Sequence, residues 1–223
     1  MTQKSFALIV ICVICVTVHL PLSFVSEARA LTAADLLTKQ VRATAIKNET
    51  FDQVLDRLTS DYQIPIGIVL GDEKLIPRRE IDLNLPETTV KDFLDAVIAK
   101  DPRYTWKLEE GVIHFQPSKE RDALLTTLLD TKISHFAFTE GTSRYRIYSE
   151  ILKLPEIQTQ LIVADVAPIV LLSSGTMRKV GISFQESNVT LRELLDRFIL
   201  RTESKRWVLM RWGKNGEYIT LRS

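Results

Sequence analysis

The chain has 223 residues, of which 45% are hydrophobic and 26% are charged, and its formal net charge is +1. This is the composition of an ordinary globular protein. The two cysteines, Cys12 and Cys15, both lie in an apolar run near the N-terminus. A mature chain without that run therefore has neither a disulfide nor thiolate chemistry.

The N-terminal segment predicts a secretory signal peptide. Lys4 precedes the apolar run F-A-L-I-V-I-C-V-I-C-V-T-V-H-L (6–20), and Ala28 and Ala30 form an A-x-A-type site for cleavage after Ala30. The alternative is an inner-membrane anchor formed by residues 6–25, because about 20 apolar residues can span a bilayer. A mature chain without cysteine fits a bacterial periplasm or cell envelope better than a eukaryotic secretory route.

The next residues predict two helices and a strand. A short helix is expected near 32–42, and T-F-D-Q-V-L-D-R-L (50–58) combines a capping-box pattern with an apolar stripe at helical spacing. Alternating apolar residues in Q-I-P-I-G-I-V-L (63–70) predict a strand. Because Pro65 has no amide hydrogen, we expect this strand at a sheet edge or with a local bulge.

A strand, a helix and a hairpin follow. I-D-L-N-L (81–85) alternates apolar and polar residues, as a half-buried strand does. Thr89 precedes apolar residues at helical spacing, so it is expected to cap a helix. Y-T-W-K-L (104–108) and V-I-H-F (112–115) then predict a hairpin.

The C-terminal half repeats this order. K-E-R-D-A-L-L-T-T-L-L-D (119–130) predicts a helix that links two units, and R-Y-R-I-Y-S-E-I-L (144–152) predicts a helix with a strand after it in 160–172. N-V-T-L-R-E-L-L-D-R-F (188–198) predicts a capped helix, and the last hairpin is expected within 206–221.

The two halves align with each other. Ile81 to Trp106 matches Ile182 to Trp207 without a gap, at an offset of 101 residues, which indicates an internal duplication. We therefore expect an α+β protein with two similar small domains, each with about two helices packed on a small mixed sheet. The expected boundaries are a signal peptide at 1–30, a first unit at 31–118, a linking helix at 119–130 and a second unit at 131–223.

The segments 81–115 and 182–221 share one pattern. A short strand precedes a T-[VL]-[KR]-[DE]-[FL]-L-D helix, a strand with an aromatic residue, a turn, and V-I-H-F or Y-I-T-L. This pattern resembles the short N-terminal domains of secretins and of TonB-dependent receptors, and the related C-terminal domain of FecR-type envelope regulators. The resemblance covers about half of the mature chain. It implies non-enzymatic periplasmic modules that bind other proteins or form rings with copies of themselves.

The sequence shows no catalytic signature. The mature chain has only His114 and His135, without H-x-x-x-H spacing, and it has no phosphate-binding glycine loop and no nucleophile elbow. His114 alternates with apolar residues and is expected to face solvent or a polar seam. The recurring Asp95 and Asp196 are expected at the boundary of a helix stripe, where charge meets water. We predict no catalytic residue, no metal and no cofactor.

Trp106 and Trp207 recur at matching positions of the two hairpins. This recurrence favours core positions, with the indole N–H reaching out to a partner. The alternative is that these rings stack on a sugar or on the side chain of another protein.

Charge is unevenly distributed, with an acidic balance in 31–118 and a basic balance in 176–223. The basic end could attract an anionic partner or the acidic half of a neighbouring copy. The simpler interpretation is a salt-bridged surface with i,i+4 pairs such as Arg192 with Asp196.

The best candidate for binding is an aromatic and basic patch in the last hairpin, formed by Arg211, Trp212, Lys214 and Tyr218. Stacking rings and cationic groups suit a glycan, a peptide or a nucleic acid. Export makes a nucleic acid the least expected of these ligands.

These observations predict an exported, non-catalytic protein-interaction or adaptor module of the bacterial cell envelope. It would bind an envelope protein or associate with itself, by strand addition at exposed sheet edges. The alternative is a cell-wall or glycan-binding protein that uses the last hairpin, and a hydrolase is the third hypothesis. Membrane contact is expected only if the N-terminal segment is not cleaved.

Overall fold

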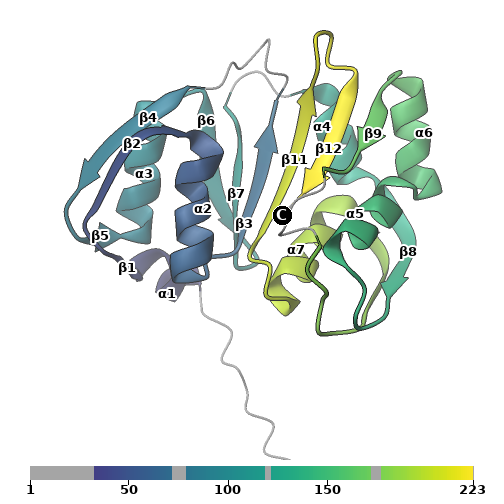
Figure 1. The fold of residues 1–223 in the computed structure, drawn as a ribbon, viewed down its shortest axis with the longest axis horizontal. Helices are drawn as coiled ribbons and strands as arrows, with labels where there is room; N and C mark the ends of the chain where they lie inside the picture. The colour runs from purple at the N-terminus through teal and green to yellow at the C-terminus, as the bar shows by residue number, and fades with distance from the viewer. Residues whose placement is uncertain (1–32, 72–78, 119–121, 172–176, 223) are drawn as a thin grey trace, which may run out of the picture. The chain divides into compact units, whose positions relative to one another are not determined.

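The structure, a computed structural model, describes residues 33–71, 79–118, 122–171 and 177–222, and the predicted signal segment lies outside them. We refer to residues 33–118 as the first half and to 122–222 as the second half. Helices and mixed sheets are both present in the described residues, which confirms the predicted α+β class (Figure 1).

The first half begins with a short helix and ends with a hairpin (Figure 1). Its elements are α1 (Ala33–Thr38), β1 (Gln40–Val41), β2 (Thr44–Thr50), α2 (Phe51–Tyr62), β3 (Ile66–Leu70), β4 (Glu80–Leu85), β5 (Thr88–Thr89), α3 (Val90–Lys100), β6 (Tyr104–Glu109) and β7 (Val112–Pro117).

The second half follows nearly the same order and has one additional helix, α6. Its elements are α4 (Ala123–Asp130), β8 (Lys132–Phe138), α5 (Arg144–Leu152), α6 (Pro155–Val163), β9 (Ala167–Ile169), β10 (Phe184–Thr190), α7 (Leu191–Arg201), β11 (Arg206–Trp212) and β12 (Tyr218–Arg222). Helices α3 and α7 begin 101 positions apart, at the offset of the sequence match. The predicted duplication and domain boundaries nevertheless remain predictions.

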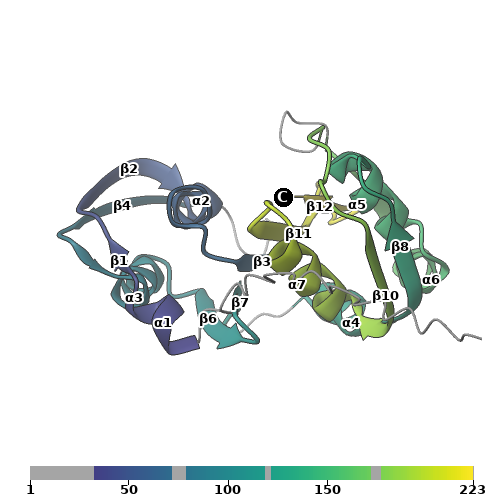
Figure 2. The same ribbon diagram turned by 90° about the horizontal axis from the view of Figure 1, so that it is seen from below.

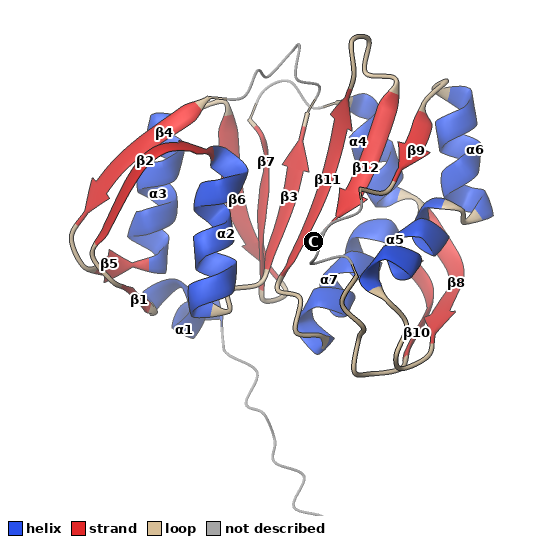
Figure 3. Ribbon diagram, viewed as in Figure 1, coloured by secondary structure: helices blue, strands red, loops and turns tan. Residues whose placement is uncertain are grey.

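One six-stranded sheet contains strands from both halves (Figure 3). Its order is β6-β7-β3-β11-β12-β9, so β3 of the first half and β11 of the second are neighbours. These two strands run parallel, with Gly67 opposite Trp207. Residues from Leu31 to Ser223 accordingly form one compact unit.

The two hydrophobic cores lie on opposite faces of this sheet. Because side chains alternate between faces along a strand, Ile66 and Ile68 of β3 belong to the first core, whereas Val69 belongs to the second. Figure 2 shows α2 and α7 on opposite sides of β3 and β11. The central strands are therefore buried on both faces, as the burial of every residue of β3 shows.

The expectation that the strand after Pro65 lies at a sheet edge is wrong. β3 lies between β7 and β11. Pro65 is compatible with this central place because the strand begins one residue later, at Ile66. Its carbonyl accepts from the amide of Ile113 at 3.0 Å, so the proline still contributes an acceptor to the sheet.

The helix linking the two predicted units is present as α4, but it belongs to the core of the second half. Leu125, Leu128 and Leu129 are buried in that core. The segment 160–172 differs from the expected strand, because its first residues complete α6 and only Ala167–Ile169 are extended.

Threonine caps fix the starts of the repeated helices, as the sequence predicts. The Thr89 hydroxyl accepts from the amide of Asp92 at 3.1 Å, and the Thr190 hydroxyl accepts from that of Glu193 at 3.2 Å. The Glu193 carboxylate in turn accepts from the Thr190 amide at 2.7 Å, which completes a capping box.

Substitution of Gly67 tests the close packing of β3 against β11. A Cβ at this position would lie 2.3 Å from a ring carbon of Trp207. We expect Gly67→Ala to destabilise the protein by about 2 kcal/mol or more, because overpacking costs roughly 1–3 kcal/mol. Urea denaturation would measure the change. Gly181→Ala is the matched control, because a Cβ at Gly181 has no atom within 4 Å; equal stability of the two variants would contradict the expectation.

Candidate functional site

The four residues of the predicted patch in the last hairpin do not share one face. Trp212 and Tyr218 are cross-strand partners whose ring centroids are 4.9 Å apart. The Trp212 indole N–H donates to the Thr220 hydroxyl at 2.8 Å, and the ring packs against the core of the first half. Lys214 is exposed in the turn. The two aromatic rings thus form a pair that is partly buried.

Arg211 faces away from this aromatic pair, because neighbouring residues of a strand point to opposite faces. Its Nε donates to the Gly216 carbonyl at 2.6 Å, and its Nη1 lies 3.4 Å from the Asp122 carboxylate. The structure therefore brings Trp212 and Tyr218 together and places the Arg211 cation elsewhere. A binding role for the four residues remains a prediction.

Basic residues of the second half pair with acidic residues of the first. Arg206 lies 2.8 Å from Asp56, and Arg222 lies 2.8 Å from Asp52. Burial lowers the pKa of the Arg206 guanidinium, and the Asp56 carboxylate acts in the opposite direction. Part of the charge asymmetry seen in the sequence is thus neutralised inside the molecule.

A hydrogen bond between an aspartate and a tryptophan joins helix to hairpin in each half. The Trp106 indole N–H donates to Asp95 of α3 at 2.9 Å, and that of Trp207 donates to Asp196 of α7 at 2.8 Å. The recurring aspartates therefore orient the recurring tryptophans. Asp95 lies at the boundary of the helix stripe and faces solvent, as expected, because its side chain is 48% exposed.

Asp196 is buried, unlike Asp95, because the first half covers it. Its second carboxylate oxygen lies 3.2 Å from His114 Nε2, without the alignment of a hydrogen bond. Trp207 is completely buried beside Gly67, and its ring centroid is 5.9 Å from that of His114. These residues, Gly67, His114, Asp196 and Trp207, form what we call the junction cluster.

The junction cluster corrects the expectations for His114 and Asp196. His114 does not face solvent, because its exposed fraction is 1%. Arg192, the expected i,i+4 partner of Asp196, is not its ion-pair partner in the described structure, and His114 lies beside the carboxylate instead. Sequence reasoning missed Gly67, although a glycine inside an apolar strand is a signal for close approach of another group.

The outer edge of β6 is open as far as the described residues extend. In the described part of the chain, β6 pairs only with β7. The Ser118 amide donates to the Arg103 carbonyl at 2.7 Å, which shows that the backbone N–H and C=O groups of Arg103 point toward β7. Because backbone groups alternate along an antiparallel strand, the N–H and C=O groups of Trp106 and Leu108 face outward.

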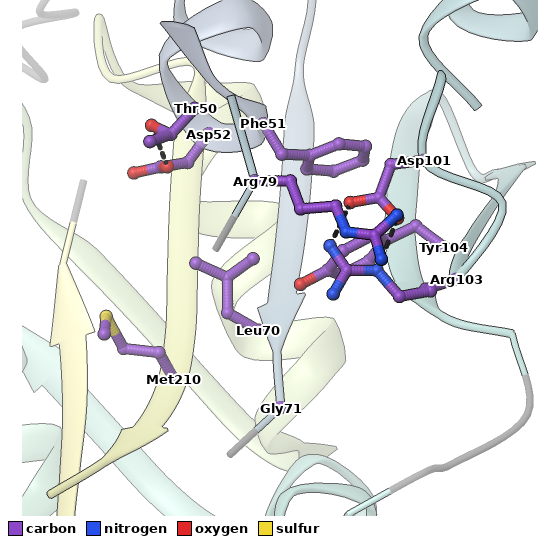
Figure 4. Close-up of a pocket in the computed structure, with 10 residues that line it drawn as sticks. All are labelled: Thr50, Phe51, Asp52, Leu70, Gly71, Arg79, Asp101, Arg103, Tyr104 and Met210. Carbon is purple, nitrogen blue, oxygen red and sulfur yellow. Dashed lines mark hydrogen bonds and ion pairs between the residues drawn. The ribbon is translucent and has the colours of Figure 1, made fainter. Parts of the chain in front are cut away.

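A small cavity lies at one end of the first core (Figure 4). In the close-up, the guanidinium groups of Arg79 and Arg103 lie next to the Asp101 carboxylate. Arg103 binds that carboxylate through two nitrogens, each at 2.6 Å, and this contact raises the pKa of Arg103. The free volume of about 20 Å³ holds about one water molecule. The arrangement is consistent with a structural ion pair.

A larger open groove runs between the β2–β4 pair and α3. Its volume is about 720 Å³, and its helix side is formed by Ala96, Ala99 and Lys100. In the second half, α7 carries Arg197 and Arg201 at the offset of 101, and both pair with Glu186. Of the two alanines, Ala96 corresponds to Arg197 and Ala99 to Leu200, so both positions carry larger side chains in the second half.

Within the described ranges, no group of three or more His, Cys, Asp and Glu residues is arranged to hold a metal ion. None of the helices described is both long enough and apolar enough to cross a bilayer.

Comparison with known proteins gave no match to a family model, to a curated protein or to a solved structure. The resemblance to secretin and receptor N-terminal domains therefore remains a prediction from the sequence.

Removal of the two aspartates should have unequal effects. We expect Asp196→Ala to cost about 2 kcal/mol, because it leaves the buried Trp207 N–H without an acceptor. Asp95→Ala should cost less than about 1 kcal/mol, because water reaches Trp106 at its partly exposed site. Thermal and urea denaturation would give both values. Asp196→Asn keeps an acceptor and serves as control; if it were as harmful as Asp196→Ala, the hydrogen bond would not be the cause.

Asp95 should also make stability depend on pH. The hydrogen bond from Lys91 holds the pKa of its carboxyl below the ordinary value of 3.8. Partial burial opposes this shift, and the hydrogen bond from Trp106 adds to it. A lowered folded-state pKa stabilises the protein above 3.8, and this contribution is lost as pH falls through the folded-state pKa. We therefore expect the stability advantage of wild type over Asp95→Asn to shrink below pH 3.8 in urea titrations. A difference that is constant with pH would contradict this expectation.

Proposed function

We propose that this chain is a non-catalytic protein-interaction module of a bacterial cell envelope, exported by its N-terminal segment. It binds a partner protein by adding a strand to the edge of its sheet. The proposal concerns binding alone, and it assigns no chemical step to any residue.

The open edge of β6 is the observation that carries this proposal. The outward N–H and C=O groups of Trp106 and Leu108 are available to pair with another chain. The partly exposed Trp106 and Leu108 side chains lie along the same strand and pack against the first core. Such an edge offers both main-chain hydrogen bonds, which supply affinity, and apolar contact.

Sequence features support the envelope location. The apolar run at 6–20, the A-x-A-type site ending at Ala30 and the absence of cysteine after residue 30 suit export to a bacterial periplasm. The resemblance to secretin and receptor N-terminal domains supports a partner in the same compartment.

The proposal is tested in the native cells, with a C-terminal tag on the full chain. We expect the mature protein in the periplasmic or envelope fraction, with its new N-terminus at Leu31, and we expect crosslinking to yield a defined complex with one protein partner. N-terminal sequencing, fractionation and mass spectrometry of the crosslinked complex are the measurements. A cytoplasmic protein with an intact N-terminus, or a monomer that forms no crosslinked complex in any fraction, would remove the proposal.

A further inference from the structure

We infer that the edge of β6 binds a strand from a different protein, that this strand runs parallel to β6, and that it carries glycine opposite Trp106. This inference rests on the proposed function and specifies the direction and the chemistry of the strand that the β6 edge binds.

The pairing of β11 with β3 inside the molecule provides the template. These strands are parallel, and the Ile66 amide donates to the Lys205 carbonyl at 2.8 Å. By alternation, the backbone groups of Trp207 and Leu209 also face β3. β3 thus pairs with an edge of β11 at which the backbone groups of Trp207 and Leu209 point outward.

β6 presents the same edge, and no described strand covers it. Its outward groups belong to Trp106 and Leu108, which have the same spacing as Trp207 and Leu209. The Trp106 ring is held by Asp95 at 2.9 Å, as Trp207 is held by Asp196 at 2.8 Å. The two sites differ in burial: Trp207 is completely buried, whereas Trp106 is only partly buried.

The orientation of the tryptophan dictates a glycine in the covering strand. At the junction a Cβ on Gly67 would come within 2.3 Å of Trp207 ring carbons, so any side chain there would force the ring to move. Because Trp106 is tied to its helix by the same hydrogen bond, a strand that covers it in the same way meets the same restriction.

The other free edge of the sheet does not match β6. That edge is β9, whose residues are Ala167, Pro168 and Ile169. The Ala167 amide donates inward to the Glu217 carbonyl at 2.9 Å, so the next nitrogen, that of Pro168, faces outward and has no hydrogen to donate. β9 also lacks a glycine. Among the described strands β3 alone contains a glycine, and it is already paired with β7 and β11. A second folded copy therefore offers no described strand that could cover β6 as β3 covers β11, and the occupant is a different protein.

The test uses the full chain and a peptide with the sequence of Ile64–Gly71, I-P-I-G-I-V-L-G, extended by lysines for solubility. The control peptide carries valine in place of the glycine that corresponds to Gly67. We expect the glycine peptide to slow amide hydrogen exchange at Trp106 and Leu108, measured by NMR, and to bind at least about tenfold more tightly than the valine peptide, which corresponds to about 1.4 kcal/mol. Equal binding of both peptides, protection confined to other strands, or no binding would overturn the inference.

Variants of the edge give a second test. Leu108→Pro removes an outward N–H and leaves the ladder with β7 intact, so the peptide should no longer bind, whereas Leu108→Ala keeps the N–H and should retain binding. If Leu108→Pro does not fold, Trp106→Ala tests the requirement for glycine instead. The space left by the ring should let the valine peptide bind about as well as the glycine peptide. Unchanged discrimination in Trp106→Ala would overturn the requirement for glycine.

Failure of this inference can be distinguished from failure of the proposed function. A crosslinked partner that slows hydrogen exchange at Trp106 and Leu108, together with equal binding of the glycine and valine peptides, would overturn this inference and leave the proposed function standing. The absence of any crosslinked partner would remove the proposed function itself.

Discussion

The contact of Trp207 with Gly67 is the constraint on which the rest of the structure depends. The indole can approach β3 this closely only because Gly67 has no side chain. That close approach lets β3 and β11 pair, and their pairing joins two three-stranded groups into one sheet. With the sheet continuous, each core covers one face of the shared strands, and Arg206 and Arg222 come within reach of acidic residues on α2.

The same local motif has different properties in its two places. A capped helix presents an aspartate to a tryptophan in both halves. In the second half β3 and β7 of the first half cover this pair, so the carboxylate becomes a buried acceptor beside His114. In the first half nothing described covers the pair, and Asp95 forms an ion pair with Lys91 at 2.6 Å. Position in the sheet, not local sequence, sets the burial of the motif and the neighbours of its aspartate.

Local patterns were enough to predict the repeated helices, their threonine caps and the hairpins, because each depends on residues that are close in sequence. The partners of strand edges could not be predicted in the same way. Pro65 predicts an edge position or a local bulge for β3, but its neighbour β11 lies 140 positions later in the chain. The burial of His114 likewise depends on a helix of the second half. The separation of Arg211 from Trp212 was predictable, because adjacent residues of a strand face opposite sides.

The parallel pairing of β3 with β11 also has a consequence for biosynthesis. Translation proceeds from the N-terminus, so the first half can collapse around its own core long before β11 exists. Until Arg206 to Met210 have been made, the edge of β3 next to Gly67 has no strand from its own chain to pair with. An unpaired apolar edge is a template for association with other chains. The growing chain therefore passes through a stage in which every residue of β3 is present while the strand that covers one of its edges is not.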